Sequence, residues 1–558
     1  MAQQLYFSRD TRMFIQFRNT TDNTEQPIDL GKGALWEIPV LDGYSFSQTT
    51  NTSEIALSEM ESSAGISRRG RRMFTDSLAP AEWSFSTYIR PFKSLAGSVA
   101  TGTKAADTAG EVHAVEEVLW ASMFGADKYD ANKFVRNIQP ISGTESDVIT
   151  PSSGAGASSI ITMAESNRSA LHSFTLWFLI DTATSNPLLY RMPEAIVNEA
   201  SVDFDVDGIA TINWSGMAKE VQDNSSKLSV SANNTPATNT GRVGGDAMVI
   251  GDLVVNTGNT RAVSIVTGIN AGSAISAPTQ AIDEAITSTK NFIRNRLTGV
   301  SIEAADGSDK VAGIFPGRHA IVSAVTTATN TVTTSTSHNF NNGDQVYITG
   351  VAGTTELNTT HNFVGAKTAN TFRLYTTKAL ALAGHASTGV FALTNSYSSS
   401  TGIVANGQYS LTLTGGSFNI GNNITYLVPE ELGAINKPLE HVTGTRTATG
   451  NATCYLTLED TDSTNGTSRQ FFNDMVGTGA MSKVVNKFKV TMDVGGTAAA
   501  ADDTNPVLSI EFPTAHIEVP SHSIEDVISL ETNFTALPTD FGQANEITSV
   551  TYKPPATY

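Results

Sequence analysis

The chain has 558 residues, a formal net charge of −19 at pH 7, and 40% hydrophobic residues. This length predicts several domains, and the acidic balance argues against a protein that holds nucleic acid through its phosphates. The single cysteine, Cys454, excludes an intrachain disulfide and a cysteine-cluster metal site. We expect no signal peptide at the N-terminus. We also expect no membrane partner, because no apolar run approaches the roughly 18 residues that a spanning helix needs.

Composition predicts a mainly β protein. Charged residues make up only 16% of the chain, well below the roughly 25% of ordinary globular domains. Gly, Ser, Thr and Asn take their place, and these residues favour strands and turns over helices.

Residues 1–221 are predicted to form a first β domain. Strands are expected at 5–17, at 34–40 and at 82–89, where alternation places Trp83, Phe85 and Ile89 on the covered side. Helical spacing of apolar residues predicts one helix over 111–124. A buried strand at 173–181 and a hairpin of 194–206 with 209–214 complete the domain.

A long polar excursion lies inside this domain, between residues 41 and 92. It carries Arg68, Arg69, Arg71 and Arg72 around one glycine. Loops beyond about 12–15 residues are usually functional or disordered, so we expect this one to contact something outside its own domain. In so acidic a chain an acidic surface on another subunit is the preferred partner. A solvated loop and a contact with nucleic acid remain the alternatives.

The pattern of the first domain recurs after residue 296. The run Leu413-Thr-Gly-Gly-Ser-Phe-Asn419 resembles Leu41-Asp-Gly-Tyr-Ser-Phe-Ser47. An alternating strand, a helix, a strand ending in Asp and a closing hairpin then follow in the same order at similar spacings. A second domain like the first is therefore predicted over 297–317 and 394–558, with 222–296 as a linker or extra β segment. Two unrelated β domains of similar composition are the alternative.

Residues 318–393 interrupt the second copy. Short strands alternate with Asn-Asn-Gly and Gly-Val-Ala-Gly turns, which predicts an inserted small β barrel or immunoglobulin-like sandwich. The stretch 338–374 resembles a module that is common in phage structural proteins, and this resemblance implies a decoration domain on an outer surface.

The whole chain then resembles a known family. The stretch 36–92, with LSEM at 57–60 and RRGRRMFTDSLAPAEWSFSTYIRPF at 68–92, is similar to tail tube proteins of long-tailed bacteriophages. The resemblance implies two tube-type β barrels or sandwiches with one helix each, and rings of three chains with pseudo-sixfold symmetry. It further implies stacking into a tube for DNA ejection, with a long loop that bridges to the next ring. Implied partners are further copies of the chain, the tape measure, the tail terminator, baseplate or tip proteins and a sheath; the implied location is the virion tail, after assembly in the host cytoplasm.

Acidic residues alternate with apolar ones before the turn at 207–208. One strand face would carry Asp203, Asp205 and Asp207, and the other face the intervening Val and Phe residues. We expect the acidic face to line the bore and repel DNA phosphates; an ordinary solvated outer face is the alternative. The spacing also resembles the start of a calcium loop, but Trp214 occupies the position where a bidentate Glu is required.

The sequence predicts no enzyme. It has no phosphate-binding loop, no dinucleotide-binding glycine pattern and no nucleophile elbow, so no catalytic residue, metal site or cofactor is expected. A tail fibre or receptor-binding adhesion protein is the main alternative function, and a cell-wall-degrading virion enzyme is the third.

Overall fold

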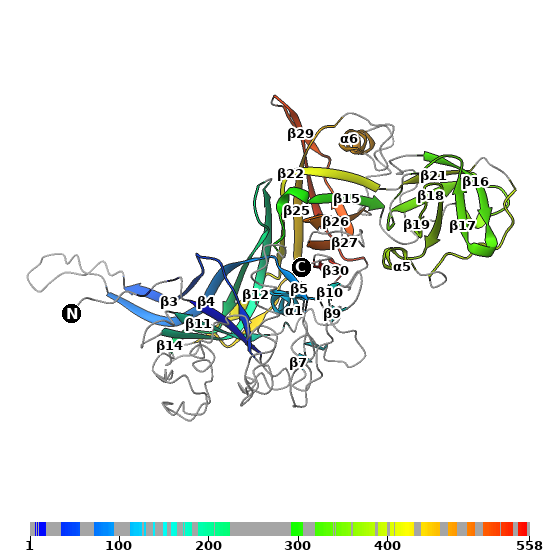
Figure 1. Cartoon of the computed structure of the whole chain (residues 1–558). Coiled ribbons are helices and arrows are strands. Elements are labelled where there is room, and N and C mark those ends of the chain that lie inside the picture. Colours follow the sequence, from blue (N-terminus) through cyan, green and yellow to red (C-terminus); the bar gives the residue numbers. More distant parts are fainter. Residues whose placement is uncertain are drawn as a thin grey trace, which may run out of the picture.

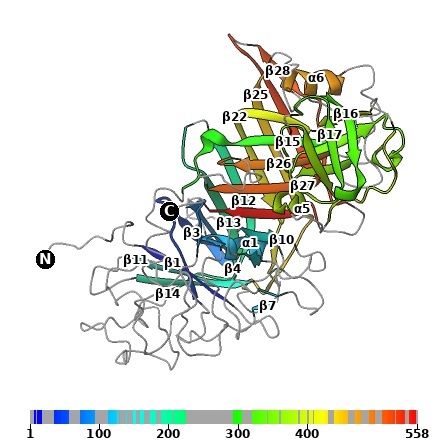
Figure 2. The same ribbon diagram turned by 45° about the vertical axis from the view of Figure 1, so that its right-hand side comes forward.

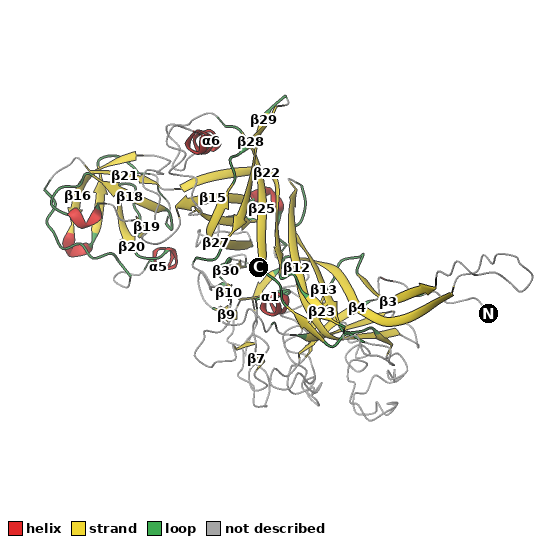
Figure 3. Ribbon diagram, turned by 180° about the vertical axis from the view of Figure 1, so that it is seen from behind, coloured by secondary structure: helices red, strands yellow, loops and turns green. Residues whose placement is uncertain are grey.

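The protein is mainly β, with few short helices, as the computed structural model shows (Figure 3). The structure describes residues 6, 8, 11–17, 35–55, 72–93, 112–124, 128–129, 138–139, 149–152, 158–163, 171, 173–180, 188–205, 207–223, 292–304, 319–338, 340, 342–358, 361–384, 389–398, 402–406, 408–428, 437–457, 467–476, 488–496, 506–524, 526–539 and 545–554. Most strands belong to one large sheet, and a small closed barrel lies beside it (Figure 1).

The first half of the large sheet is an antiparallel unit. Its strands are β1 (Arg12–Phe17), β2 (Leu35–Ile38), β3 (Ser45–Ile55), β4 (Arg72–Tyr88), β11 (Phe174–Ile180), β12 (Leu188–Asp205) and β13 (Thr211–Ala218). They pair in the order β2-β1-β11-β12-β13-β4-β3. The chain itself connects the two ends of this order, because β3 follows β2 after residues 39–44. Trp83, Phe85 and Ile89 are buried, which confirms the alternation predicted for this strand.

The second half repeats this order of pairing. Its strands are β15 (Gly299–Ala304), β22 (Gln408–Gly421), β25 (Thr447–Tyr455), β26 (Phe488–Val494), β27 (Val507–Ile517), β28 (Ser521–Ile524) and β29 (Ile528–Ala536). The order β22-β15-β26-β27-β29-β25 closes on β22 again. The N-terminal part of β22 thus takes the place of β2 and its C-terminal part the place of β3. The strands β15, β26, β27, β29 and β25 match β1, β11, β12, β13 and β4.

The two units form one continuous structure (Figure 2). Residues 199–205 of β12 pair antiparallel with residues 415–421 of β22. Their buried side chains belong to a single apolar cluster that extends from Met13 to Tyr552. Short strands complete the body: β5 (Pro91–Lys93), β6 (Val112–Ala114), β7 (Lys128–Tyr129), β8 (Ile138–Gln139), β9 (Ile149–Pro151), β10 (Ser159–Thr162), β14 (Gln222–Asp223), β23 (Thr425–Leu427), β24 (Glu440–Val442) and β30 (Ser549–Lys553).

In the described part of the chain, one helix accompanies each unit. In the second unit α6 (Ser468–Val476) is the predicted counterpart of the helix in the first. The first helix, α1 (Glu117–Met123), is shorter than the predicted 111–124. Residues 112–114 instead form β6, which pairs with β5. The apolar spacing continued into this segment because Val112 and Ala114 are buried as strand residues.

The closed barrel is a separate packing unit. It consists of β16 (His319–Thr326), β17 (Thr331–Thr334), β20 (Thr371–Tyr375), β19 (His361–Gly365), β18 (Gln345–Thr349) and β21 (Gly402–Asn406), with α5 (Lys378–Ala383) against it. Among the described residues, short 3-10 helices lie at 295–297, 327–329 and 355–357. The barrel has its own apolar core, which includes Val322, Phe340 and Phe372. Its sixth strand, β21, lies after residue 393, where the inserted module was expected to end.

The first helix contacts β30 beside a buried carboxyl group. Glu116, directly before α1, is fully buried. Among the described residues none donates a hydrogen bond of normal geometry to its carboxylate. Burial raises the pKa of Glu116 to about 7, although Tyr552 and Arg90 act in the opposite direction. Tyr552 in β30 also accepts a hydrogen bond of 2.7 Å from Trp120 Nε1 of α1.

We predict that Glu116 makes the protein less stable as the pH rises from about 4.5 to about 7. Over this interval the folded state holds a proton that the unfolded state has released, so the free energy of unfolding falls by up to about 3 kcal/mol. The Glu116→Gln variant should flatten this slope, as measured by denaturant unfolding at several pH values. A variant that keeps the slope of the wild-type protein would contradict the assignment.

Candidate assembly surfaces

The side of the large sheet that faces away from the core is polar across both units. The strands lie in the order β3-β4-β13-β12-β22-β25-β29, and β28 follows β29 at the end. Alternation turns one set of side chains to the core and the other set outward. One outward row crosses six strands through directly paired residues: Ser86, Asn213, Ser201, Asn419, Thr449 and Thr535.

Acidic residues are the charged groups of this polar face. A second row contains Asp203, Ser417, Asn451 and Asn533, and a third joins Asp205 to Glu531 through residues 415 and 453. No lysine or arginine occurs in the segments that form the face: 45–47, 82–88, 199–205, 211–215, 415–421, 447–455 and 528–536. The face therefore offers small neutral groups and carboxylates, and these described segments hold no cation for a phosphate.

The structure places the predicted acidic residues at one end of this face. Asp203 and Asp205 are exposed in β12, while Val202 and Phe204, which alternate with them, are buried. Asp207 is exposed in the turn after β12. The outward position of these carboxylates agrees with the predicted alternation. Glu199 and Glu531 belong to the same face, but the sequence gives no sign of this, because it depends on pairing between distant strands.

A long hairpin extends away from the body. Strands β3 and β4 pair from Ser45–Ser84 to Ile55–Arg72, and Figure 1 shows them reaching beyond the other strands. Near its far end Met73 and Phe74 are 57% and 59% exposed. Adjacent residues of a strand point to opposite faces, so each face of this end carries an exposed apolar side chain.

One member of the predicted arginine cluster lies at the end of the same hairpin. Arg72 is the first residue of β4 and pairs with Ile55 of β3. Arg68, Arg69 and Arg71 lie outside the described residues. In the sequence the cluster directly precedes Met73 and Phe74. The contacts of its arginines remain a prediction.

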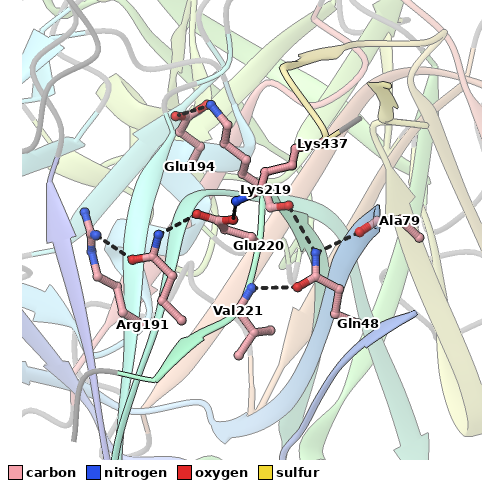
Figure 4. Close-up of polar contacts among 9 residues, drawn as sticks. Gln48, Ala79, Arg191, Glu194, Lys219, Glu220, Val221 and Lys437 are labelled. Atoms are coloured by element: carbon pink, nitrogen blue, oxygen red, sulfur yellow. Dashed lines mark hydrogen bonds and ion pairs between the residues drawn. The ribbon is translucent and has the colours of Figure 1, made fainter. Parts of the chain in front are cut away.

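The side chain of Gln48 links the base of the β3–β4 hairpin to the residues that follow β13. Its Nε2 donates a hydrogen bond of 2.8 Å to the Ala79 carbonyl and one of 3.4 Å to the Lys219 carbonyl. Its Oε1 accepts a hydrogen bond of 3.0 Å from the Val221 backbone N–H. One side chain of β3 thus links both strands of the hairpin to the segment that follows β13 (Figure 4).

Ion pairs connect this segment to both halves of the chain. Glu220 accepts from Gln222 Nε2 and, at 3.1 Å, from Lys437 Nζ of the second half. Arg191 of β12 donates to Gln222 Oε1 at 2.7 Å, and Lys219 pairs with Glu194 at 3.3 Å. Partial burial acts to raise the pKa of Glu220, but its partners, foremost Gln222 and Lys437, hold it below the ordinary value. This contribution to stability is present at neutral pH and is lost as acid protonates the carboxylate.

The described part of the chain shows neither a metal site nor a membrane helix. No group of three or more His, Cys, Asp or Glu side chains in it could hold a metal ion. No helix among the same residues has the length and apolarity needed to cross a membrane.

Comparison with known proteins gives one informative similarity. No family model matches the chain. The tail tube protein pb6 of Escherichia phage T5 is 33% identical to it over 141 residues, which is 25% of this chain and 28% of that protein. The matched stretch is thus less than a third of the relative's length. This similarity supports a relationship to tail tube proteins and a structural role in a phage tail.

We predict that Gln48→Ala loosens the attachment of the hairpin. The Val221 N–H loses its acceptor, with a local cost on the order of 1–2 kcal/mol, so amide hydrogen exchange should accelerate in residues 48–51 and 219–222. Asn51→Ala is the matched control. Asn51 Nδ2 donates a hydrogen bond of 2.8 Å to Ser77 Oγ at an exposed site. Equal exchange in the two variants would contradict the role assigned to Gln48.

Proposed function

We propose that this protein is the subunit of a bacteriophage tail tube. In this proposal the two halves of the chain arose by duplication, three chains close into a ring of six like units, and rings stack into a hollow tube. The observation that carries the proposal is the repeated order of pairing in two units that share one sheet. The similarity to a tail tube protein over 141 residues supports it independently.

The polar face is the surface that suits the bore of such a tube. A conduit for DNA has to let the polyanion pass without holding it. Small Ser, Thr and Asn side chains give few strong contacts, and carboxylates such as Asp203 and Asp205 repel phosphates over about 8 Å at physiological salt. The opposite, apolar face of the same strands packs into the core, so only the polar face is free for this role.

The hairpin of β3 and β4 is proposed to contact the neighbouring ring. It projects from the body (Figure 1), and it presents Met73 and Phe74 to solvent in a single chain. Exposed apolar side chains at the end of a projecting element are typical of protein–protein contacts. The adjacent Arg68, Arg69, Arg71 and Arg72 would pair there with acidic groups of the next ring, in keeping with the acidic balance of the chain.

The closed barrel is proposed to decorate the outside of the tube. It packs around its own core and lies at the other end of the molecule from the hairpin (Figure 1). The proposed partners of the tube are further copies of this chain, the tape measure, the terminator, the baseplate or tip, and a sheath where the tail contracts.

We predict that the purified protein assembles into rings or hollow tubes, visible by electron microscopy, with three chains in each layer. The double variant Met73→Ser/Phe74→Ser should still form rings but not stack, because it removes apolar area from the projecting end. Ile321→Ser is the control, since Ile321 is 49% exposed on the barrel. Six chains per layer would overturn the duplication, and isolated spikes would favour an adhesion protein.

We predict that Asp203→Asn/Asp205→Asn slows DNA ejection, on the order of several-fold, without preventing assembly. The carboxylates are exposed and the fold does not depend on burying them, so tubes should form normally. Ejection rates would be measured from purified virions by the fluorescence of released DNA. Glu440→Gln, an acidic residue in β24 outside the polar face, should leave the rate unchanged, and a wild-type rate in the double variant would end the bore assignment.

A further inference from the structure

The polar face of the large sheet is bounded by two open strands, β3 and β28. Within the described residues β3 pairs with β4 on one side and with no strand on the other, and β28 pairs in the same way with β29 alone. Ser45 and Ser47 in β3 are exposed, and so are all four residues of β28. An open strand leaves backbone N–H and C=O groups without partners, which is the usual template for pairing with another chain.

The junction between the two units shows how such edges are covered inside the chain. Residues 199–205 of β12 pair with residues 415–421 of β22, and Ser201 lies opposite Asn419. On the covered side Phe204 and Phe418 are 6% and 0% exposed, with their ring centroids 5.9 Å apart. Backbone pairing and one aromatic contact thus seal this boundary.

The open strands occupy the same two positions in the repeated order. The end of β12 pairs with β13, as Ser201 with Asn213, and β28 continues β27 and pairs with β29, as Ser521 with Glu531. Strand β3 pairs with β4 as the C-terminal part of β22 pairs with β25. The sequence agrees, because Ser45-Phe46-Ser47 matches Ser417-Phe418-Asn419. Thus β28 matches the edge of β12, and β3 matches the edge of β22.

Exposure distinguishes the open positions from the covered ones. Ile524, at the end of β28, is 79% exposed, whereas Phe204 at the end of β12 is 6% exposed. Phe46 of β3 is half-buried, whereas its counterpart Phe418 is fully buried. The outward residues Ser521 and Ser523 extend the polar face to one edge, and Ser45 and Ser47 extend it to the other. The two open edges are therefore alike on both sides of the sheet. Each edge carries serines on the outer, polar side and an incompletely buried apolar residue on the core side.

We propose that the open edge of β28 pairs antiparallel with the open edge of β3 in a second copy of this chain. Ile524 of one copy then covers Phe46 of the next, as Phe204 covers Phe418 within the chain. The contact uses different surfaces on its two sides, so it propagates from copy to copy until the circle closes. This inference rests on the proposed function, because it specifies the strands that close each ring.

Cysteine cross-linking tests the pairing directly. A Ser523→Cys protein is mixed before assembly with a Ser45→Cys protein, and separately with a Ser47→Cys protein, and each mixture is oxidised mildly. If the two copies pair with the register that β12 and β22 have within the chain, Ser523 lies opposite Ser45. A disulfide-linked dimer of two different chains is therefore expected.

Three features control this experiment. Background should be low because the natural cysteine, Cys454, is buried. Asp203→Cys/Ser417→Cys in one chain is the positive control, since these residues lie directly opposite each other. Asn51→Cys, farther along β3, is the negative control.

A charge at the covered position provides a second test. Ile524→Arg should leave the monomer folded, because the side chain is exposed, but it should raise the concentration needed for ring formation on the order of tenfold or more. Val442→Arg, at a residue 48% exposed in β24, is the matched control.

The outcomes separate this inference from the proposed function. Rings or tubes with the expected dimer support both. Rings or tubes without a disulfide at Ser45 or Ser47 overturn the strand pairing and leave the tube intact. A chain that remains monomeric at high concentration overturns both.

Discussion

Antiparallel pairing between β12 and β22 is the interaction on which the rest of the architecture depends. Seven residues on each side share a ladder, and the apolar side chains beneath it belong to one cluster. Separating the two units would expose backbone groups and aromatic rings together, which is far costlier than breaking a surface contact. The two units are consequently held together as one sheet, whose polar face runs from β3 to β28.

Period-two alternation then determines what that sheet can do. Because the strands of the polar face pair residue by residue between 199–205, 415–421, 447–453 and 531–535, the apolar residues gather on one side there and the Ser, Thr, Asn and acidic residues on the other. The polar side is continuous across the unit boundary, as the row from Ser86 to Thr535 shows. A surface of short neutral side chains and carboxylates binds phosphates weakly, since affinity for DNA comes chiefly from Lys and Arg. The same alternation that forms the core therefore also forms a surface suited to a moving polyanion.

Local sequence patterns predicted individual strands and helices, whereas the arrangement of these elements in the sheet depends on pairing between distant segments. Alternation located the strand at 82–89 and the outward position of Asp203 and Asp205, because both depend only on neighbouring residues. It overextended the first helix into 112–114, where apolar spacing fits a strand paired with β5 equally well. The junction of β12 with β22 could not be predicted, since more than 200 residues separate its strands. For the same reason the exposure of Phe74 and Ile524 was not predictable: apolar residues in alternating strands normally imply burial, and these lie beyond the core.

The position of the barrel explains how the second unit holds a large insertion without losing its order of strands. The chain leaves the sheet after β15 and returns at β22, and Glu303 of the first lies directly opposite Gln408 of the second. The two ends of the excursion are therefore neighbours in one ladder, so a folded barrel between them demands no change in the surrounding strands. One contact between the barrel and the sheet involves Lys489 of β26, which pairs with Glu511 at 3.1 Å and lies 5.7 Å from the ring centroid of Phe363 in the barrel. Neither β3 nor β28, the open strands that bound the polar face, belongs to the barrel. The strands proposed to join neighbouring copies are therefore separate from the inserted domain.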